Sequence, residues 1–158
     1  MRLLTLFALL VTLAVAGAAA AHESPEQGRN LNVRLKPPSD GPADGFGKVD
    51  FRQPRDEAKI VYLDVFVQLL PDRSYFLERA VDTTLDGVCT GTSWLTLGQG
   101  LVPEAIETSA SGSGRAALSR DLAAIPTGTQ FDIRFRVIDA VTQGVVLQSR
   151  CYQFTVSQ

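Results

Sequence analysis

The sequence predicts an all-β domain, an antiparallel β-sandwich of roughly seven to nine strands with one disulfide. Three observations predict it. Turn residues separate short apolar stretches roughly every ten to fifteen positions, as in sandwiches and barrels. The longer stretches alternate apolar and polar residues with the period of a strand. Two cysteines, Cys89 and Cys151, follow an N-terminal export pattern, so we expect them to be oxidised.

The N-terminal residues 1–21 have the three parts of a signal peptide. Arg2 supplies a positive charge, residues 3–15 are almost entirely apolar, and residues 17–21 are glycine and alanine, which signal peptidase accepts. A membrane anchor is the alternative, but no basic stop-transfer cluster follows. We therefore expect cleavage, a secreted or periplasmic location, and no membrane span in the mature chain.

The mature chain divides into a flexible leader at residues 22–30 and a single β-sandwich domain at residues 31–158. Cleavage removes one of the 15 basic residues and none of the 17 acidic residues, so the net charge becomes about −3. Proteins that bind nucleic acids normally carry a basic face. We expect no nucleic-acid partner, and the charge balance identifies no other partner and no oligomeric state.

Period-two alternation marks the strands and is clearest in two of them. Residues 131–137 alternate Phe, Ile, Phe and Val with Asp132, Arg134 and Arg136, which predicts a half-buried strand whose charged row faces solvent. Residues 61–69 form a more central strand. Weaker alternation predicts further strands at residues 31–35, 49–51, 75–77 and 95–97. Residues 116–125 have a helix-like composition, but flanking glycines and Pro126 favour a strand followed by a loop. Residues 145–156 form the last strand, with a bulge near residues 149–151.

The two cysteines are expected to form one intramolecular disulfide. A redox pair usually has close spacing, such as Cys-x-x-Cys, whereas Cys89 and Cys151 lie far apart. The bond would close a loop of about 63 residues, and loop-closure entropy then stabilises the fold by roughly 4 kcal/mol. It would also place the segment that carries Trp94 against the last strand.

Residues 69–75, LLPDRSY, resemble the tyrosine corner of fibronectin type III and Ig-like sandwiches. The resemblance implies that the Tyr75 hydroxyl hydrogen-bonds to backbone a few residues upstream, while Leu69 and Pro71 shape the turn. It implies an Ig-like architecture and no catalytic residue. The overall style of the chain is similar to that of exported bacterial β-proteins.

The only tryptophan, Trp94, has two interpretations. A tryptophan close to a disulfide usually packs in a sandwich core, which is the role we expect. If it is exposed, it could instead be a platform for a carbohydrate partner.

The only histidine, His22, becomes the first residue if cleavage follows Ala21. An N-terminal histidine can bind copper, although the known sites of this kind need a second histidine. Cleavage after Ala19 would instead produce an Ala-Ala-His copper or nickel site. With one histidine, a Ser-His-Asp or Cys-His catalytic arrangement is not expected, and no cofactor signature occurs.

These observations favour an exported, non-enzymatic β-protein that acts as a structural, adhesive or binding module for a protein or carbohydrate partner. A small periplasmic copper-binding protein that uses His22 is the alternative. An enzyme that uses carboxylates is the third possibility, with Asp64, Asp82 and Asp86 as candidates, and residues 81–87 could also form a calcium loop. A turn capped by aspartates is the interpretation that we favour for that loop.

Overall fold

The computed structural model describes residues 27–39, 44–55 and 59–158. These residues form strands and loops and contain no helix, hence none long and apolar enough to cross a membrane. The all-β prediction is confirmed. The thirteen strands are β1 (Gln27–Gly28), β2 (Leu31–Lys36), β3 (Phe46–Arg52), β4 (Ile60–Gln68), β5 (Ser74–Asp82), β6 (Leu95–Thr96), β7 (Gly98–Gln99), β8 (Val102–Pro103), β9 (Ile106–Glu107), β10 (Ser113–Asp121), β11 (Gln130–Asp139), β12 (Val145–Ser149) and β13 (Tyr152–Thr155).

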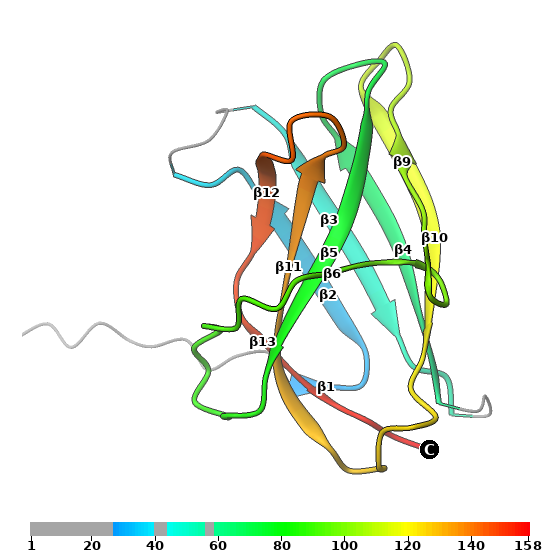
Figure 1. The fold of residues 1–158 in the computed structure, drawn as a ribbon, viewed down its shortest axis with the longest axis vertical. Coiled ribbons are helices and arrows are strands. Elements are labelled where there is room, and N and C mark those ends of the chain that lie inside the picture. The colour runs from blue at the N-terminus through cyan, green and yellow to red at the C-terminus, as the bar shows by residue number, and fades with distance from the viewer. Residues whose placement is uncertain (1–26, 40–43, 56–58) are drawn as a thin grey trace, which may run out of the picture.

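Two groups of long strands make up most of the sheet (Figure 1). In the first group, β2, β3, β4 and β10 pair antiparallel in that order. In the second group, β11 pairs with β5 along one edge and with β12 and β13 along the other. The pairing of β12 with β2 joins the two groups.

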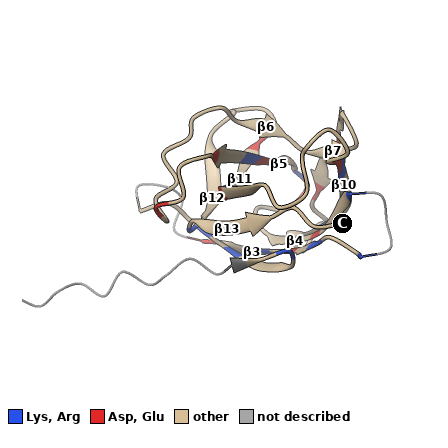
Figure 2. Ribbon diagram, turned by 90° about the horizontal axis from the view of Figure 1, so that it is seen from below, with Lys and Arg blue, Asp and Glu red and all other residues tan. Residues whose placement is uncertain are grey.

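Short strands close the remaining gap, between β5 and β10. Strands β6 and β9 pair with β5, while β7 pairs with β10 and Thr108 bridges to Gly114. Viewed along the long axis, the strands lie around a ring (Figure 2). The strands therefore belong to one hydrogen-bonded sheet that forms a nearly closed barrel. The two separate sheets of the expected Ig-like sandwich are not confirmed.

The period-two alternation directs one face of each long strand into the barrel. In β4, Val61, Leu63, Val65 and Val67 are buried, whereas Asp64 is exposed. This pattern fixes the register of the strand against its neighbours, because a slip of one residue would expose the whole apolar row. The resulting core also takes residues from β2, β3, β5, β10, β11 and β13.

The two ends of the described chain lie together. Residues 1–26, and with them the expected signal peptide, lie outside the described residues. Gln27 and Gly28, at the end of the expected flexible leader, form β1, which pairs parallel with β13. The last long strand is divided into β12 and β13 at Arg150 and Cys151, close to the expected bulge. This break lets β11 pair with both halves.

Candidate functional site

The barrel interior contains a cavity of about 80 Å³ at one end. This is the lower end in Figure 1, where β3, β5 and β10 end and where β4 and β11 begin. The lining is almost wholly apolar and comes from strands on both sides of the barrel and from the connection between β10 and β11. It includes Phe51, Val61, Val81, Leu122, Ile125 and Phe131.

Two arginines also line this cavity, one on each side of the seam that the short strands close. Arg79 lies on β5 in the inward row of Tyr75, Leu77 and Val81, opposite the buried Phe135 of β11. Arg120 lies on β10, two residues after the buried Leu118. It is opposite Val61, which also points inward. Strand geometry therefore directs both guanidinium side chains toward the interior.

The guanidinium charge of Arg79 is not compensated by any described residue. None of them accepts a hydrogen bond from the Arg79 side chain or forms an ion pair with it. Burial lowers the pKa of Arg79, and the positive charge of Arg120 lowers it further. Arg120 donates one hydrogen bond to the carbonyl of Gly100 at 3.0 Å. At the same end, Lys59 Nζ donates to the carbonyl of Ile125 at 3.1 Å, which adds a third cation beside the lining.

The chemistry of the cavity lining is simple. Its described lining contains arginine and apolar side chains only, with no serine, cysteine, histidine, aspartate or glutamate. A guanidinium carries five N–H donors and keeps its proton in proteins. The arrangement therefore offers an apolar space beside two positively charged groups of donors.

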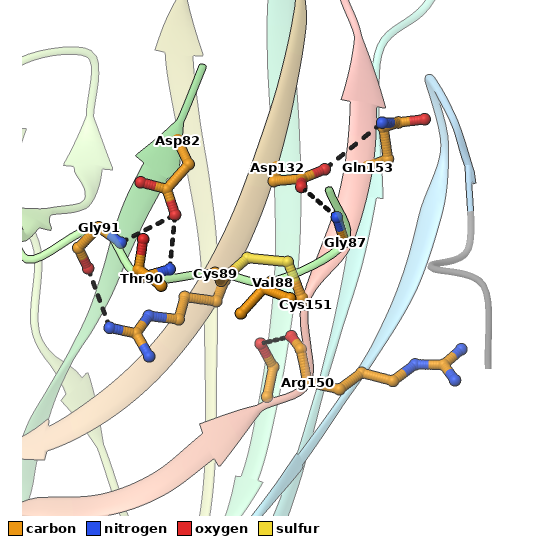
Figure 3. The surroundings of a disulfide bond; sticks show 12 residues. Asp82, Gly87, Val88, Cys89, Thr90, Gly91, Asp132, Arg150, Cys151 and Gln153 are labelled. Carbon is orange, nitrogen blue, oxygen red and sulfur yellow. Dashed lines mark hydrogen bonds between the residues drawn. A yellow bond between two sulfur atoms is a disulfide. The ribbon is translucent and has the colours of Figure 1, made fainter. Parts of the chain in front are cut away.

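The disulfide anchors the long loop between β5 and β6, residues 83–94, to the outside of the barrel (Figure 3). Cys89 and Cys151 are bonded, with their Cα atoms 5.4 Å apart, so the predicted pairing is confirmed. The backbone N–H groups of Thr90 and Gly91 donate to Asp82 Oδ2 at 2.6 and 2.8 Å. These two bonds hold Thr90 and Gly91 against Asp82, the last residue of β5.

The loop covers the outward row of β11, so the prediction that this charged row faces solvent is wrong. Asp132 is fully buried and accepts hydrogen bonds from Gly87 N at 2.7 Å and Gln153 Nε2 at 3.4 Å. Arg134 donates to the carbonyl of Gly91 at 2.9 Å. Arg136 forms a 2.6 Å ion pair with Glu78. The alternation correctly predicted that this row points outward. It could not show that a loop covers the row.

Trp94 also lies on this outer face. It is partly exposed and stands apart from the hydrophobic core, so the expected core packing does not occur. Instead, the guanidinium carbons of Arg134 and Arg136 lie 4.9 and 3.9 Å from its ring centroid. Arg134 Nε is buried without a hydrogen-bond partner among the described residues, whereas the same guanidinium donates from Nη2 to Gly91 and lies over the Trp94 ring.

The segment from Leu69 to Tyr75 lies at the opposite end of the barrel. Tyr75 is buried, with 1% exposure. Burial raises the pKa of Tyr75, the charge of Asp139 raises it further, and the backbone of Leu70 lies close enough to the hydroxyl to lower it slightly. Leu69 packs against the core, whereas Pro71 is exposed and borders an open depression of about 420 Å³. Of the two carboxylates that line this depression, Asp72 and Asp139, the second already accepts hydrogen bonds from Val141 N, Thr142 N and Arg73.

The remaining sequence candidates do not assemble into a site. His22 lies outside the described residues. Within residues 27–39, 44–55 and 59–158, no group of three His, Cys, Asp or Glu side chains could hold a metal ion. Asp64 lies on the outer face of β4, whereas Asp82 and Asp86 accept backbone hydrogen bonds within the loop. This is the aspartate-capped turn that we favoured.

Arg79 and Arg120 were missed by the sequence analysis, although a signal for Arg79 was present. Tyr75, Leu77 and Val81 continue one alternating row, and Arg79 occupies the position where that row requires an apolar side chain. A charge at an inward position is an exception that points to a function or a partner. Comparison of the chain with protein-family models, with curated proteins and with solved structures found no match.

Proposed function

We propose that this chain is an exported, non-enzymatic binding module that takes a small ligand into the lower end of its barrel. The cavity is the observation that carries the proposal. Barrel ends are common ligand sites, since the strands form a rigid wall and the interior excludes water. A lining without nucleophiles or carboxylates supports binding over catalysis.

The export part of this proposal rests on the N-terminal signal-peptide pattern and on the disulfide. A disulfide is compatible with an oxidising compartment outside the cytoplasm. Edman sequencing of the protein recovered from an expressing bacterial host tests it, with a mature N-terminus expected at His22. A chain that keeps residues 1–21 would contradict the export proposal and leave the cavity proposal unaffected.

Titration with two small probes of equal size tests the cavity proposal. Butanamide is neutral and butanoate is anionic, and both tails fit the volume available. Addition of at least one of them should shift the methyl NMR signals of Leu122 and Ile125, which line the cavity, but not those of Leu101, which is 81% exposed elsewhere. The variant Val81→Phe fills the cavity and should remove the shift. Unchanged Leu122 and Ile125 signals with both probes would refute the proposal.

We also propose that residues 69–75 act as a tyrosine corner, as in fibronectin type III and Ig-like domains. The burial of Tyr75 beside the backbone of Leu70 supports this interpretation, and so does the bend at residues 70–72 that precedes β5. In such corners the hydroxyl stabilises the passage of the chain from one strand to the next. The variant Tyr75→Phe, discussed below, tests it.

A further inference from the structure

We infer that Arg79 and Arg120 bind the carboxylate of a small organic acid whose short apolar tail occupies the barrel cavity. This inference rests on the proposed function and names the class of ligand. It assigns the head group to the two arginines and the tail to the apolar lining.

The placement of the arginines is costly unless an anion joins them. Burying an ionic group requires compensation by an opposite charge or by hydrogen bonds. Arg79 is half-buried and lines the same cavity as a second guanidinium, and no described residue compensates it. A carboxylate between the two arginines would supply both the negative charge and the acceptors. Arginine is well suited to this role, because its planar fork matches the two oxygens of a carboxylate.

The cavity volume limits the tail. An apolar cavity of about 150 Å³ holds benzene, which has six carbons. The cavity here measures about 80 Å³. By proportion it accommodates roughly three or four carbons, which corresponds to butanoate or pentanoate. Phe51, Leu122 and Phe131 give this space an apolar wall, which favours an aliphatic tail over a polar one.

The surroundings favour an anion over a cation or a neutral ligand. Lys59 lies at the same end and donates to Ile125, a lining residue. The described lining includes no carboxylate that would attract a cation. A neutral amide of the same shape would leave the two guanidinium charges uncompensated, so the carboxylate should bind more tightly.

The experiment compares butanoate with butanamide by NMR titration of the purified protein. We expect butanoate to bind at least tenfold more tightly. Arg79→Met should bring the two affinities to within twofold, while Arg115→Met should leave the preference unchanged. Arg115 is the matched control because it is exposed on the outer face of β10, the strand that carries Arg120. Acetate, which has the charge but almost no tail, should bind more weakly than butanoate.

A second measurement on the ligand-free variants separates a binding role from a structural one. Because Arg79 and Arg120 repel each other, Arg79→Met should raise the melting temperature of the free protein. Addition of butanoate should raise the melting temperature of the unmodified protein but not that of the Arg79→Met variant. A lower melting temperature for Arg79→Met would make Arg79 a structural residue and would overturn the inference.

The outcomes distinguish the two proposals. Equal binding of butanoate and butanamide at the cavity refutes the carboxylate inference and leaves the binding module standing. A preference for butanoate that survives Arg79→Met also refutes it, because the anion would then be bound elsewhere. If neither probe shifts the cavity signals, both proposals fail.

Discussion

The guanidinium carbon of Arg136 lies 3.9 Å from the centroid of the Trp94 ring, on the outer face of the barrel. The same side chain donates from Nε to Glu78 Oε2 at 2.6 Å. Arg136 therefore connects the covering loop to a carboxylate of β5 whose side chain is only 10% exposed. A cation over an aromatic ring adds about 0.5 to 2 kcal/mol, depending on its desolvation.

Replacement of Arg136 by Met should lower the free energy of unfolding by about 2 to 3 kcal/mol, because Glu78 would keep its charge without its cationic partner and retain only the 3.3 Å bond from Thr96 Oγ1. We expect less than for a fully buried pair, since the Arg136 side chain is 25% exposed. Denaturant titration measures the loss. Arg115→Met is the control, because Arg115 lies 5.0 Å from the Phe66 ring but is exposed and forms no ion pair with a described residue. It should change stability by less than about 0.5 kcal/mol. Equal losses in the two variants would contradict the role of Arg136.

The disulfide joins the loop to the outside of the barrel, so its removal should affect the loop first. Replacing Cys89 and Cys151 together by Ala should cost roughly 4 kcal/mol, the loop-closure value, while the core strands still form. Trp94 is the only tryptophan, so its fluorescence reports on the loop alone. We expect a red shift of the Trp94 emission with little change in far-UV circular dichroism.

Intact-mass analysis provides the control for the bond itself. Alkylation of the unreduced, denatured protein should add no mass, and alkylation after reduction should add two groups. Two groups added before reduction would show that the thiols are free. Loss of the β-sheet signal together with the fluorescence change would show that the bond holds the core as well as the loop.

Removal of the Tyr75 hydroxyl tests the contact with the backbone of Leu70. Tyr75→Phe keeps the buried ring and should lower stability by about 1 kcal/mol, the net value of a typical hydrogen bond. Tyr152→Phe should cost a similar amount, because the buried Tyr152 hydroxyl accepts a 3.0 Å bond from Arg34 N. Leu70→Ala should be nearly neutral, since that side chain is 61% exposed and its backbone is unchanged. An unaltered stability of Tyr75→Phe would remove the corner assignment.

Asp139 should make the protein less stable in acid. Hydrogen bonds hold its pKa below the usual value, chiefly the bond from the Thr142 backbone, which is 2.9 Å long. An unfolded aspartate titrates near about 3.9, so the carboxylate stabilises the fold fully above that pH. Its contribution is lost as the pH falls through the lower folded pKa. The stability difference between the unmodified protein and Asp139→Asn should be greatest near neutral pH and should shrink below about pH 4.

Denaturant titrations at several pH values measure this dependence. Asp64→Asn is the control, because Asp64 is exposed on the outer face of β4. A stability difference for Asp139→Asn that stays constant from neutral to acidic pH would rule out the carboxylate charge as its source.

The strands and the disulfide could be predicted from sequence because their signals are local. Alternation over residues 61–69 and 131–137 depends on neighbours in the chain, and two cysteines allow only one intramolecular pair. Closure of the barrel could not be predicted in this way. It depends on strands such as β6, β7 and β9, each of two residues, which are too short to show a period.

The same limit explains the errors on the outer face and at the cavity. Alternation tells which residues of β11 point outward, but a loop distant in sequence decides whether they meet water. Asp132 therefore resembled a solvated residue although it is fully buried. Arg79 visibly interrupts the alternating row of Tyr75, Leu77 and Val81, but only the strand register, which places it opposite the buried Phe135, shows that this position points into the barrel.

The location of the last strands constrains the order of events during biosynthesis. Strand β12 supplies the only pairing that links β2 to β11 in the described sheet, and Gln53 at the end of β3 exchanges hydrogen bonds with Ser157. The wall of the barrel therefore stays open until the C-terminal residues have been synthesised. A ribosome-bound chain that stops before β12 exposes an unpaired edge of β2, which is a surface that chaperones protect and that other chains can join. Closure of the barrel wall therefore has to follow the synthesis of β12 and of Ser157.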